Sequence, residues 1–187
     1  MKIHAQSADG NTDYDITLKN ENNVIQNIFD WRGKDIEVVS NRAVQIGYAS
    51  GTVNAITASG DFKLTARGAV TDNISPHNIA IAGLTTITAQ SADGNTDYDI
   101  TLDLNEHDFS TISVTGANVE LVDANAIVLG ASTVSGTYSV TATSDNITDS
   151  GALTITGTST FVTSAKNATI TLDQGGHAFT GALLITT

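Results

Sequence analysis

The sequence predicts an all-β chain wound as a right-handed parallel β-solenoid (a β-helix), on three observations. One long block recurs almost unchanged, because Ile3–Leu18 reads IHAQSADGNTDYDITL and Ile87–Leu102 reads ITAQSADGNTDYDITL. Short apolar-alternating runs recur about every eight to twelve residues, separated by small or turn-forming residues, without a sustained helical period. Two-residue hairpin turns are scarce, which favours stacked parallel coils over an antiparallel sandwich or barrel.

The composition agrees with a strand-rich solenoid. Hydrophobic residues make up 40% of the 187 residues and aromatic residues only 5%, so the core must consist of Val, Ile, Leu, Ala and Thr. β-branched side chains suit pleated strands, and Gly, Asn and Asp suit tight corners. We expect a single solenoid domain over residues 1–187. Its repeat blocks span about 3–86 and 87–187, with an irregular insert at about 19–34.

Weaker internal matches extend the repeat along the chain. DIEVVSNRAVQIG (35–47) matches NVELVDANAIVLG (118–130), and ITLDLNEHDF (100–109) matches ITLDQGGHAF (170–179). Repeats of this kind stack like residues on like in successive coils. The second match places His107 and His177 at equivalent positions. We interpret both histidines as parts of a structural corner rather than as metal ligands or catalytic groups.

The elements NVELVDANAIVLG and ITDSGALTITG resemble the repeat region of filamentous-haemagglutinin-type large exoproteins and adhesins. The resemblance covers about residues 69–187 well and 19–34 poorly. It implies a long right-handed β-helix displayed at a Gram-negative cell surface, and therefore an extracellular or cell-surface location. The start, MKIHAQSADG, has no hydrophobic run of the kind found in signal peptides. If the protein is exported, we therefore expect this chain to be a mature form, a fragment or a recombinant piece.

The charge and the apolar runs restrict the partners. The formal net charge is −12, and an acidic surface repels phosphate backbones, so we expect no nucleic-acid partner. Residues 1–86 carry seven Lys and Arg against nine Asp and Glu, whereas residues 87–187 carry one against eleven. No apolar run approaches the length of a membrane span, so we expect none. The chain has no cysteine, which excludes disulfides and thiolate metal sites.

The expected function is structural. The first and last rungs of a solenoid have unpaired edges that invite pairing, and no amphipathic capping helix is evident in the sequence. We therefore expect a rod that stacks end to end on copies of itself in a filament, or that forms part of an adhesin shaft. The alternative is a module that binds carbohydrate or a host surface. No pair of acids stands out beyond the turn clusters, so we do not expect an enzyme.

Two sets of residues are candidate sites. The motif DGNTDYD places oxygen-bearing side chains at alternating positions, as at the start of a calcium loop. The possible calcium ligands are Asp9, Asn11, Asp13, Asp93, Asn95 and Asp97. Gly is second rather than sixth and no Glu closes the motif, so a solvated turn before a strand is the alternative. We expect no cofactor other than this possible calcium.

The second candidate is a ligand site at Trp31 and Arg32, in the least regular stretch of the chain. Tryptophan stacks on sugars and arginine pairs with carboxylates. A loop that projects from a rod would suit such a role. The alternative is a covering loop whose tryptophan fills the inside of the coil.

Overall fold

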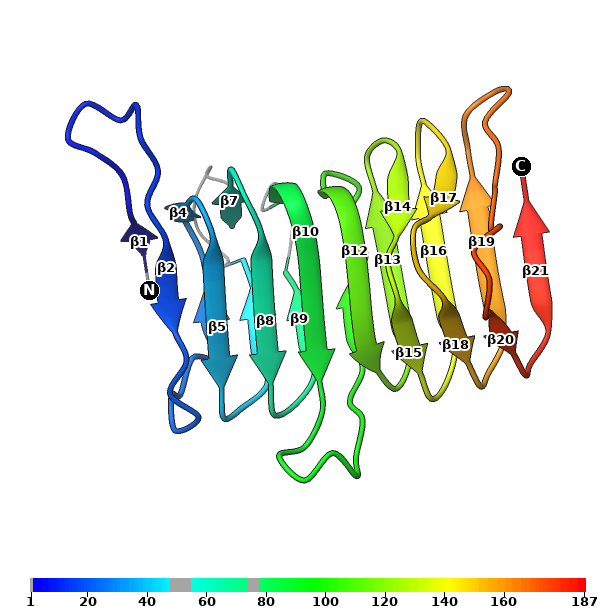
Figure 1. The fold of residues 1–187 in the computed structure, drawn as a ribbon, viewed down its shortest axis with the longest axis horizontal. Coiled ribbons are helices and arrows are strands. Elements are labelled where there is room, and N and C mark those ends of the chain that lie inside the picture. Colours follow the sequence, from blue (N-terminus) through cyan, green and yellow to red (C-terminus); the bar gives the residue numbers. More distant parts are fainter. Residues whose placement is uncertain (1, 48–54, 74–77) are drawn as a thin grey trace.

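The computed structural model describes residues 2–47, 55–73 and 78–187, which form an all-β parallel solenoid of about seven turns (Figure 1). Every ladder between two named strands is parallel, and the N- and C-terminal segments lie at opposite ends of the rod. This confirms the expected fold class. The right-handed winding stays a prediction, which rests on the strong preference of parallel crossovers for that hand.

The strands are short and follow one another round the coils. They are β1 (Ile3–His4), β2 (Ile16–Leu18), β3 (Asn27–Ile28), β4 (Trp31–Gly33), β5 (Ile36–Ser40), β6 (Val44–Ile46), β7 (Ile56–Ala58), β8 (Phe62–Ala66), β9 (Val70–Asp72), β10 (Ile79–Ala89), β11 (Ile100–Leu102), β12 (Asp108–Gly116), β13 (Val119–Asp123), β14 (Ile127–Leu129), β15 (Ser132–Val134), β16 (Tyr138–Ala142), β17 (Ile147–Asp149), β18 (Leu153–Ile155), β19 (Ser159–Thr163), β20 (Ala178–Phe179) and β21 (Leu183–Thr186).

Two sheets run along the rod. The eight-stranded sheet follows the order β21-β19-β16-β13-β11-β9-β6-β3, and every neighbour in it is parallel. The thirteen-stranded sheet covers the rest of the coil, because β10 and β12 are long enough to continue round a corner. Each coil therefore presents its backbone groups to the coil before it and the coil after it, and the interior fills with stacked side chains.

The alternation of apolar and polar residues along each strand corresponds to side chains that point alternately into the core and toward the surface. In β8, Phe62, Leu64 and Ala66 are buried while Lys63 and Thr65 face outward. In the eight-stranded sheet one ladder position runs through Leu121, Val140, Phe161 and Ile185 of successive coils. Each fully buried Leu, Ile, Val or Phe contributes about 1.5–3 kcal/mol relative to exposure, so these columns hold the coils together.

The near-identical blocks occupy different faces of the solenoid. In the first copy β2 pairs with β5 in the thirteen-stranded sheet, but in the second copy β11 pairs with β13 in the eight-stranded sheet. The local contacts are nevertheless the same: a Cβ added to Gly33 would lie 2.8 Å from Tyr14 O, and one on Gly116 would lie 2.9 Å from Tyr98 O. The block therefore repeats after a non-integral number of turns.

The stretch 19–34 is less of an insert than we expected. Its second half contains β3 and β4, which pair with β6 and β7 and belong to the first coil. β4 also pairs with β1, so it lies between two other strands. The chain turns sharply between β3 and β4 at Asp30, whose φ of 55° is left-handed. The part before β3 is the longest piece of this stretch without strand structure.

Candidate functional site

Two loops of identical sequence project from the rod, one near its N-terminal end and one at its middle (Figure 1). Both are closed by the same backbone contacts: Ser7 N donates to Thr12 O at 2.8 Å, and Ser91 N donates to Thr96 O at 2.8 Å. Gly10 has the same left-handed φ of 71° as its counterpart in the second loop. The loops are thus one rigid turn used twice, and they leave the rod from different faces.

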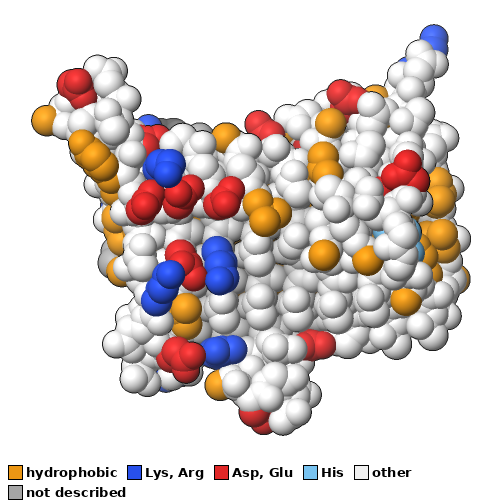
Figure 2. All heavy atoms as spheres, in the orientation of Figure 1, with side chains coloured by type: hydrophobic (Ala, Val, Ile, Leu, Met, Phe, Trp, Pro, Cys, Tyr) orange, Lys and Arg blue, Asp and Glu red, His pale blue; other side chains and the backbone are white. Residues whose placement is uncertain are grey.

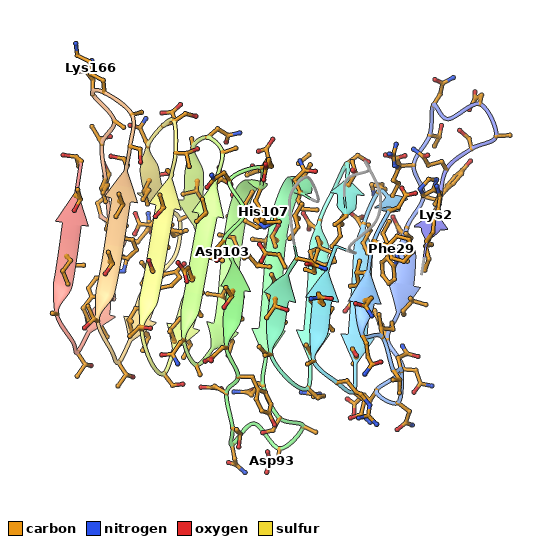
Figure 3. The ribbon with its side chains drawn as sticks, turned by 180° about the vertical axis from the view of Figure 1, so that it is seen from behind. Lys2, Phe29, Asp93, Asp103, His107 and Lys166 are labelled. Atoms are coloured by element: carbon orange, nitrogen blue, oxygen red, sulfur yellow. The ribbon has the colours of Figure 1, made fainter. Side chains whose placement is uncertain are left out.

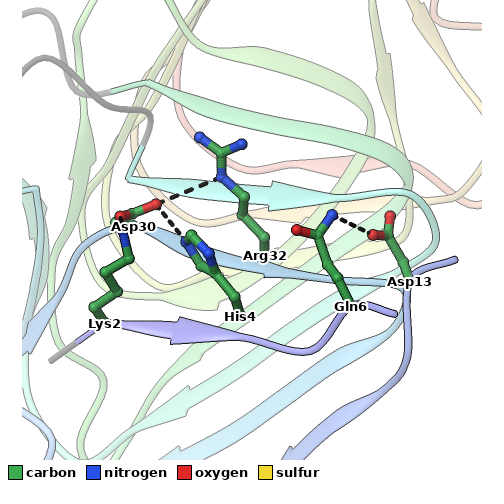
Figure 4. Close-up of polar contacts among 6 residues, drawn as sticks. All are labelled: Lys2, His4, Gln6, Asp13, Asp30 and Arg32. Carbon is green, nitrogen blue, oxygen red and sulfur yellow. Dashed lines mark hydrogen bonds and ion pairs between the residues drawn. The ribbon is translucent and has the colours of Figure 1, made fainter. Parts of the chain in front are cut away.

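The carboxylates of these loops are occupied by the loops themselves. Asp9 accepts hydrogen bonds from the hydroxyl of Ser7 and from the backbone and side-chain N–H groups of Asn11. These bonds, that from Ser7 first, lower the pKa of Asp9 to about 2, and the same set lowers the pKa of Asp93 to about 2. Asp13 accepts instead from Gln6 Nε2 at 2.7 Å (Figure 4). Both oxygens of Asp9 are therefore used inside a turn.

The six expected calcium ligands do not form one cluster. They lie as two separate turns, and among residues 2–47, 55–73 and 78–187 no group of three or more His, Asp or Glu side chains could hold a metal ion. The geometry favours the solvated turn that we kept as the alternative. Calcium binding stays a prediction without a cage of acidic ligands to support it.

Trp31 is not in a projecting loop, and this part of the ligand-site expectation is wrong. The side chain is fully buried in β4, between the neighbouring strands β1 and β7. An aromatic ring stacks on a sugar only if its face is accessible, and here the face is covered by the core. The alternative, a tryptophan that fills the coil, describes what the structure shows. Arg32 is still partly exposed and lies beside Asp30.

Three cationic or titratable side chains surround Asp30 (Figure 4). Asp30 is buried and forms an ion pair with Lys2, while its Oδ1 lies 2.7 Å from His4 Nε2 and 3.5 Å from Arg32 Nε. Burial alone would raise the pKa of Asp30, but the hydrogen bonds from Lys2 and His4 outweigh it and hold the pKa below its ordinary value. Lys2 and His4 flank Ile3 of β1, so Asp30 fastens this edge strand to the first coil.

His107 and His177 lie at equivalent corners, as the repeat suggested, and make equivalent contacts. His107 Nδ1 accepts the backbone N–H of Ile79 at 3.0 Å, and His177 Nδ1 accepts that of Leu153 at 3.0 Å. Figure 3 shows His107 with Asp103 near the middle of the rod. Each histidine joins the start of a strand in one coil to a turn in the next. This bonding suits a structural corner.

Charged side chains are unevenly distributed on the surface. Figure 2 shows Lys and Arg gathered over the N-terminal coils, where Glu37 pairs with both Lys19 and Lys63 on successive rungs. These bonds, that from Lys19 first, hold the pKa of Glu37 below its ordinary value. Exposed ion pairs of this kind contribute little stability. The two halves of the rod differ in net charge because seven of the eight Lys and Arg residues lie in residues 1–86.

The last rung of the rod exposes apolar side chains. Leu183, Leu184 and Ile185 of β21 are 46%, 48% and 52% exposed, whereas the inward residues of β19 beneath them are buried. β21 pairs with β19 along one edge, and among the described residues no strand pairs with its other edge. Ile185 lies on Phe161, so it continues a core column, while Leu184 lies on the outward Thr160. The core thus opens at this end.

The fold and the stacked repeats define a parallel β-solenoid repeat protein. A family model described as repeats of unknown function (DUF5649) matches residues 41–115 and 116–186, so the chain belongs to this family. The first matched stretch begins shortly before β6 and the second shortly before β13, and both strands lie in the eight-stranded sheet. No curated protein and no solved structure matches the chain. In the part of the chain that the structure describes, no helix is long and apolar enough to cross a membrane.

Sequence reasoning missed two polar features, and one of them had a signal. In VELVD the alternation places Asp123 on the same side as Val119 and Leu121, and the structure buries all three. A carboxylate at an inward position could therefore have been read from the sequence. The cluster at Asp30 had no such signal, because nothing in the stretch 19–34 indicated that Lys2 and His4 would lie across from it.

Proposed function

We propose that this chain is a structural rod whose C-terminal edge adds further coils, and that these coils come from a second copy of the chain. The observation that carries the proposal is the open last rung: Leu183 and Ile185 point along core columns and are about half exposed. An apolar edge strand with free backbone groups favours the addition of another strand.

Two further features support a second copy as the occupant. All ladders are parallel, so only the opposite end of another rod presents strands of the right direction, and a head-to-tail contact of this kind propagates into a filament. The acidic half, with one Lys or Arg against eleven Asp and Glu, would then meet the half with seven against nine. That arrangement has less repulsion than a contact between two acidic halves.

The setting of such a rod also remains a proposal. The resemblance of NVELVDANAIVLG and ITDSGALTITG to filamentous-haemagglutinin-type exoproteins supports an extracellular or cell-surface shaft. In that setting the molecule supplies length and rigidity, and it has no catalytic role. A solenoid suits this task because its stability comes from contacts between neighbouring coils along its length.

The test compares two substitutions in the same strand. Ile185→Lys places a charge in the core column of the open rung, whereas Leu184→Lys places one on the side of the rod, at a position of similar exposure. Sedimentation velocity and negative-stain images over a concentration series should show end-to-end growth of the unmodified chain. The growth should be abolished by Ile185→Lys and kept by Leu184→Lys. Single short rods at every concentration, or equal loss in both variants, would exclude the proposal.

The second candidate function is a binding module, and the paired loops favour it. The residues from Ala5 to Leu18 and from Ala89 to Leu102 are identical, including the exposed tips around Gly10 and Gly94, whereas residues 35–47 and 118–130 differ at most positions. Exposed loop tips tolerate change better than packed coils, so identity in the loops suggests a function for their surface. Glycan-array binding that is lost on replacing both tips by Gly-Ser would support this carbohydrate- or surface-binding role.

A further inference from the structure

Titratable side chains gather at one corner of three successive coils. Asp72 ends β9, Asp103 and His107 lie in the turn between β11 and β12, and Asp123 ends β13. His107 Nε2 lies 2.9 Å from Asp72 Oδ2, and Leu104 N donates to the same oxygen at 3.0 Å. His107 and Asp123 are fully buried. This corner belongs to coils in the middle of the rod, away from its two ends (Figure 3).

Asp123 connects the two stretches matched by the family model. Its Oδ2 accepts the backbone N–H of Phe109 at 2.6 Å and its Oδ1 accepts that of Asn125 at 2.8 Å. Phe109 belongs to the stretch 41–115 and Asp123 to the stretch 116–186. In the next coil Ala142 of β16 pairs with Asp123, so an apolar residue lies against it in the ladder. One buried carboxyl group therefore bridges the boundary between the repeats.

We propose that this corner, formed by Asp72, Asp103, His107 and Asp123, is an acid-strengthened joint between the two family repeats. It takes up a proton on Asp123 under mildly acidic conditions and holds the adjoining coils more tightly there than at neutral pH. Most folded proteins lose stability over this range as their paired carboxylates become protonated.

The charges around Asp123 support this direction. His107 Nδ1 accepts the N–H of Ile79 at 3.0 Å, and its Nε2 lies 2.9 Å from Asp72 Oδ2. Burial raises the pKa of Asp123 to about 6; the N–H groups of Phe109 and Asn125 lower it less, Asp108 adds to the rise, and His107 opposes it. Burial, with the nearby Asp72 carboxylate, also raises the pKa of Asp103. Ionising Asp123 thus places a negative charge in an apolar, already acidic corner.

The sign of the effect follows from linkage. The folded pKa of Asp123, about 6, is above its ordinary value of 3.8. The folded chain therefore binds this proton more tightly than the unfolded chain does. The stability that this gives is fully present below the ordinary pKa and is lost as the pH rises through about 6. The corner should consequently be stronger at about pH 5 than at about pH 7.5.

The experiment has two parts. Carbon-13 NMR of the side-chain carboxyl of Asp123 in the full chain should give a titration midpoint near 6. Thermal unfolding should then show that the Tm difference between the unmodified chain and Asp123→Asn changes by roughly 5 °C in favour of the unmodified chain between about pH 7.5 and 5. Asp145→Asn, at an exposed turn, is the matched control and should show no such change.

The outcomes separate clearly. A carboxyl that titrates near the ordinary value of 3.8 would overturn the proposal, and so would a Tm difference that does not depend on pH. If Asp123→Asn does not fold, the NMR titration of the unmodified chain decides alone. Neither measurement depends on whether the rods stack, so the proposal stands or fails independently of the structural role.

Discussion

His107 Nε2 lies 2.9 Å from Asp72 Oδ2, while the other ring nitrogen of His107 accepts the backbone N–H of Ile79 at 3.0 Å. A similar arrangement recurs near the C-terminal end, where His177 Nε2 is 2.8 Å from Asp149 Oδ2 and His177 Nδ1 accepts the backbone N–H of Leu153 at 3.0 Å. The side chain of His107 is fully buried and that of His177 is 14% exposed. One corner design is thus used twice at different degrees of burial.

The difference in burial predicts a difference in stability. His107→Ala leaves the N–H of Ile79 without its acceptor and the carboxylate of Asp72 with only the N–H of Leu104, and such a loss costs roughly 3–5 kcal/mol. His177→Ala should cost less, about 1–2 kcal/mol, because water reaches that corner. Urea unfolding of both variants at neutral pH measures the difference. Equal losses at the two positions would contradict the proposed effect of burial.

The ion pairs of Asp30 should determine how readily β1 separates from β4. Asp30→Asn keeps a residue that tolerates the left-handed φ of 55° but removes the charge that pairs with Lys2, His4 and Arg32. The amide of Ile3 in β1 donates to Asp30 O, and that of Ala5, directly after β1, donates to Arg32 O; both should exchange with solvent about 10-fold faster. Native-state hydrogen exchange measures this, with the amides of β13 as the internal control.

If β1 exchanges at the same rate in Asp30→Asn, the ladder to β4 alone holds the strand. The ion pairs would then be incidental. High salt is a second test on the unmodified chain, because screening weakens partly exposed pairs. It should speed the exchange of Ile3 and Ala5 without affecting the amides inside the rod.

The sequence was sufficient for the fold class, because strict alternation and a copied block leave few architectures besides stacked coils. It did not say which face of the coil each block would occupy. Alternation distinguishes inward from outward side chains, but it does not say which sheet of the coil a strand joins. The same ITL sequence therefore forms β2 in the thirteen-stranded sheet and β11 in the eight-stranded sheet. The face is determined by the number of residues in the intervening turns.

The expectation of a projecting loop at Trp31 was wrong for a related reason. The stretch around Trp31 has no clear alternation, so it looked like a projecting loop, yet Ile28, Asp30 and Trp31 are all buried. The left-handed residue at position 30 reverses the side-chain direction within the stretch. A search for strict alternation of apolar and polar residues does not detect such a reversal. The calcium motif was ambiguous in the sequence, and the hydrogen bonds of Asp9 favour the turn.

The two loops predict a specific acid response. The folded pKa of Asp9 and of Asp93 is about 2, below the ordinary 3.8, because Ser and Asn side chains hydrogen-bond the charged form. Stability from these bonds is therefore present above about pH 4 and is lost as the pH falls toward 2. The protection factors of the Asn11 and Asn95 amides against hydrogen exchange should fall together over that window.

The thermal midpoint at neutral pH should not change between calcium and chelator. A midpoint raised by calcium would restore the metal hypothesis.

The repeated glycines test whether the two blocks are equivalent despite their different faces. A Cβ on Gly33 would lie 2.8 Å from Tyr14 O, and one on Gly116 would lie 2.9 Å from Tyr98 O, both closer than real Cβ contacts allow. Gly33→Ala and Gly116→Ala should each destabilise the chain by about 1–3 kcal/mol through backbone displacement. Gly175→Ala, which meets nothing within 4 Å, is the control and should lie within about 0.5 kcal/mol of the unmodified chain. If only one of the two buried glycines is sensitive, the blocks share a sequence but not a local structure, and the face of the coil would then have to influence how a block folds.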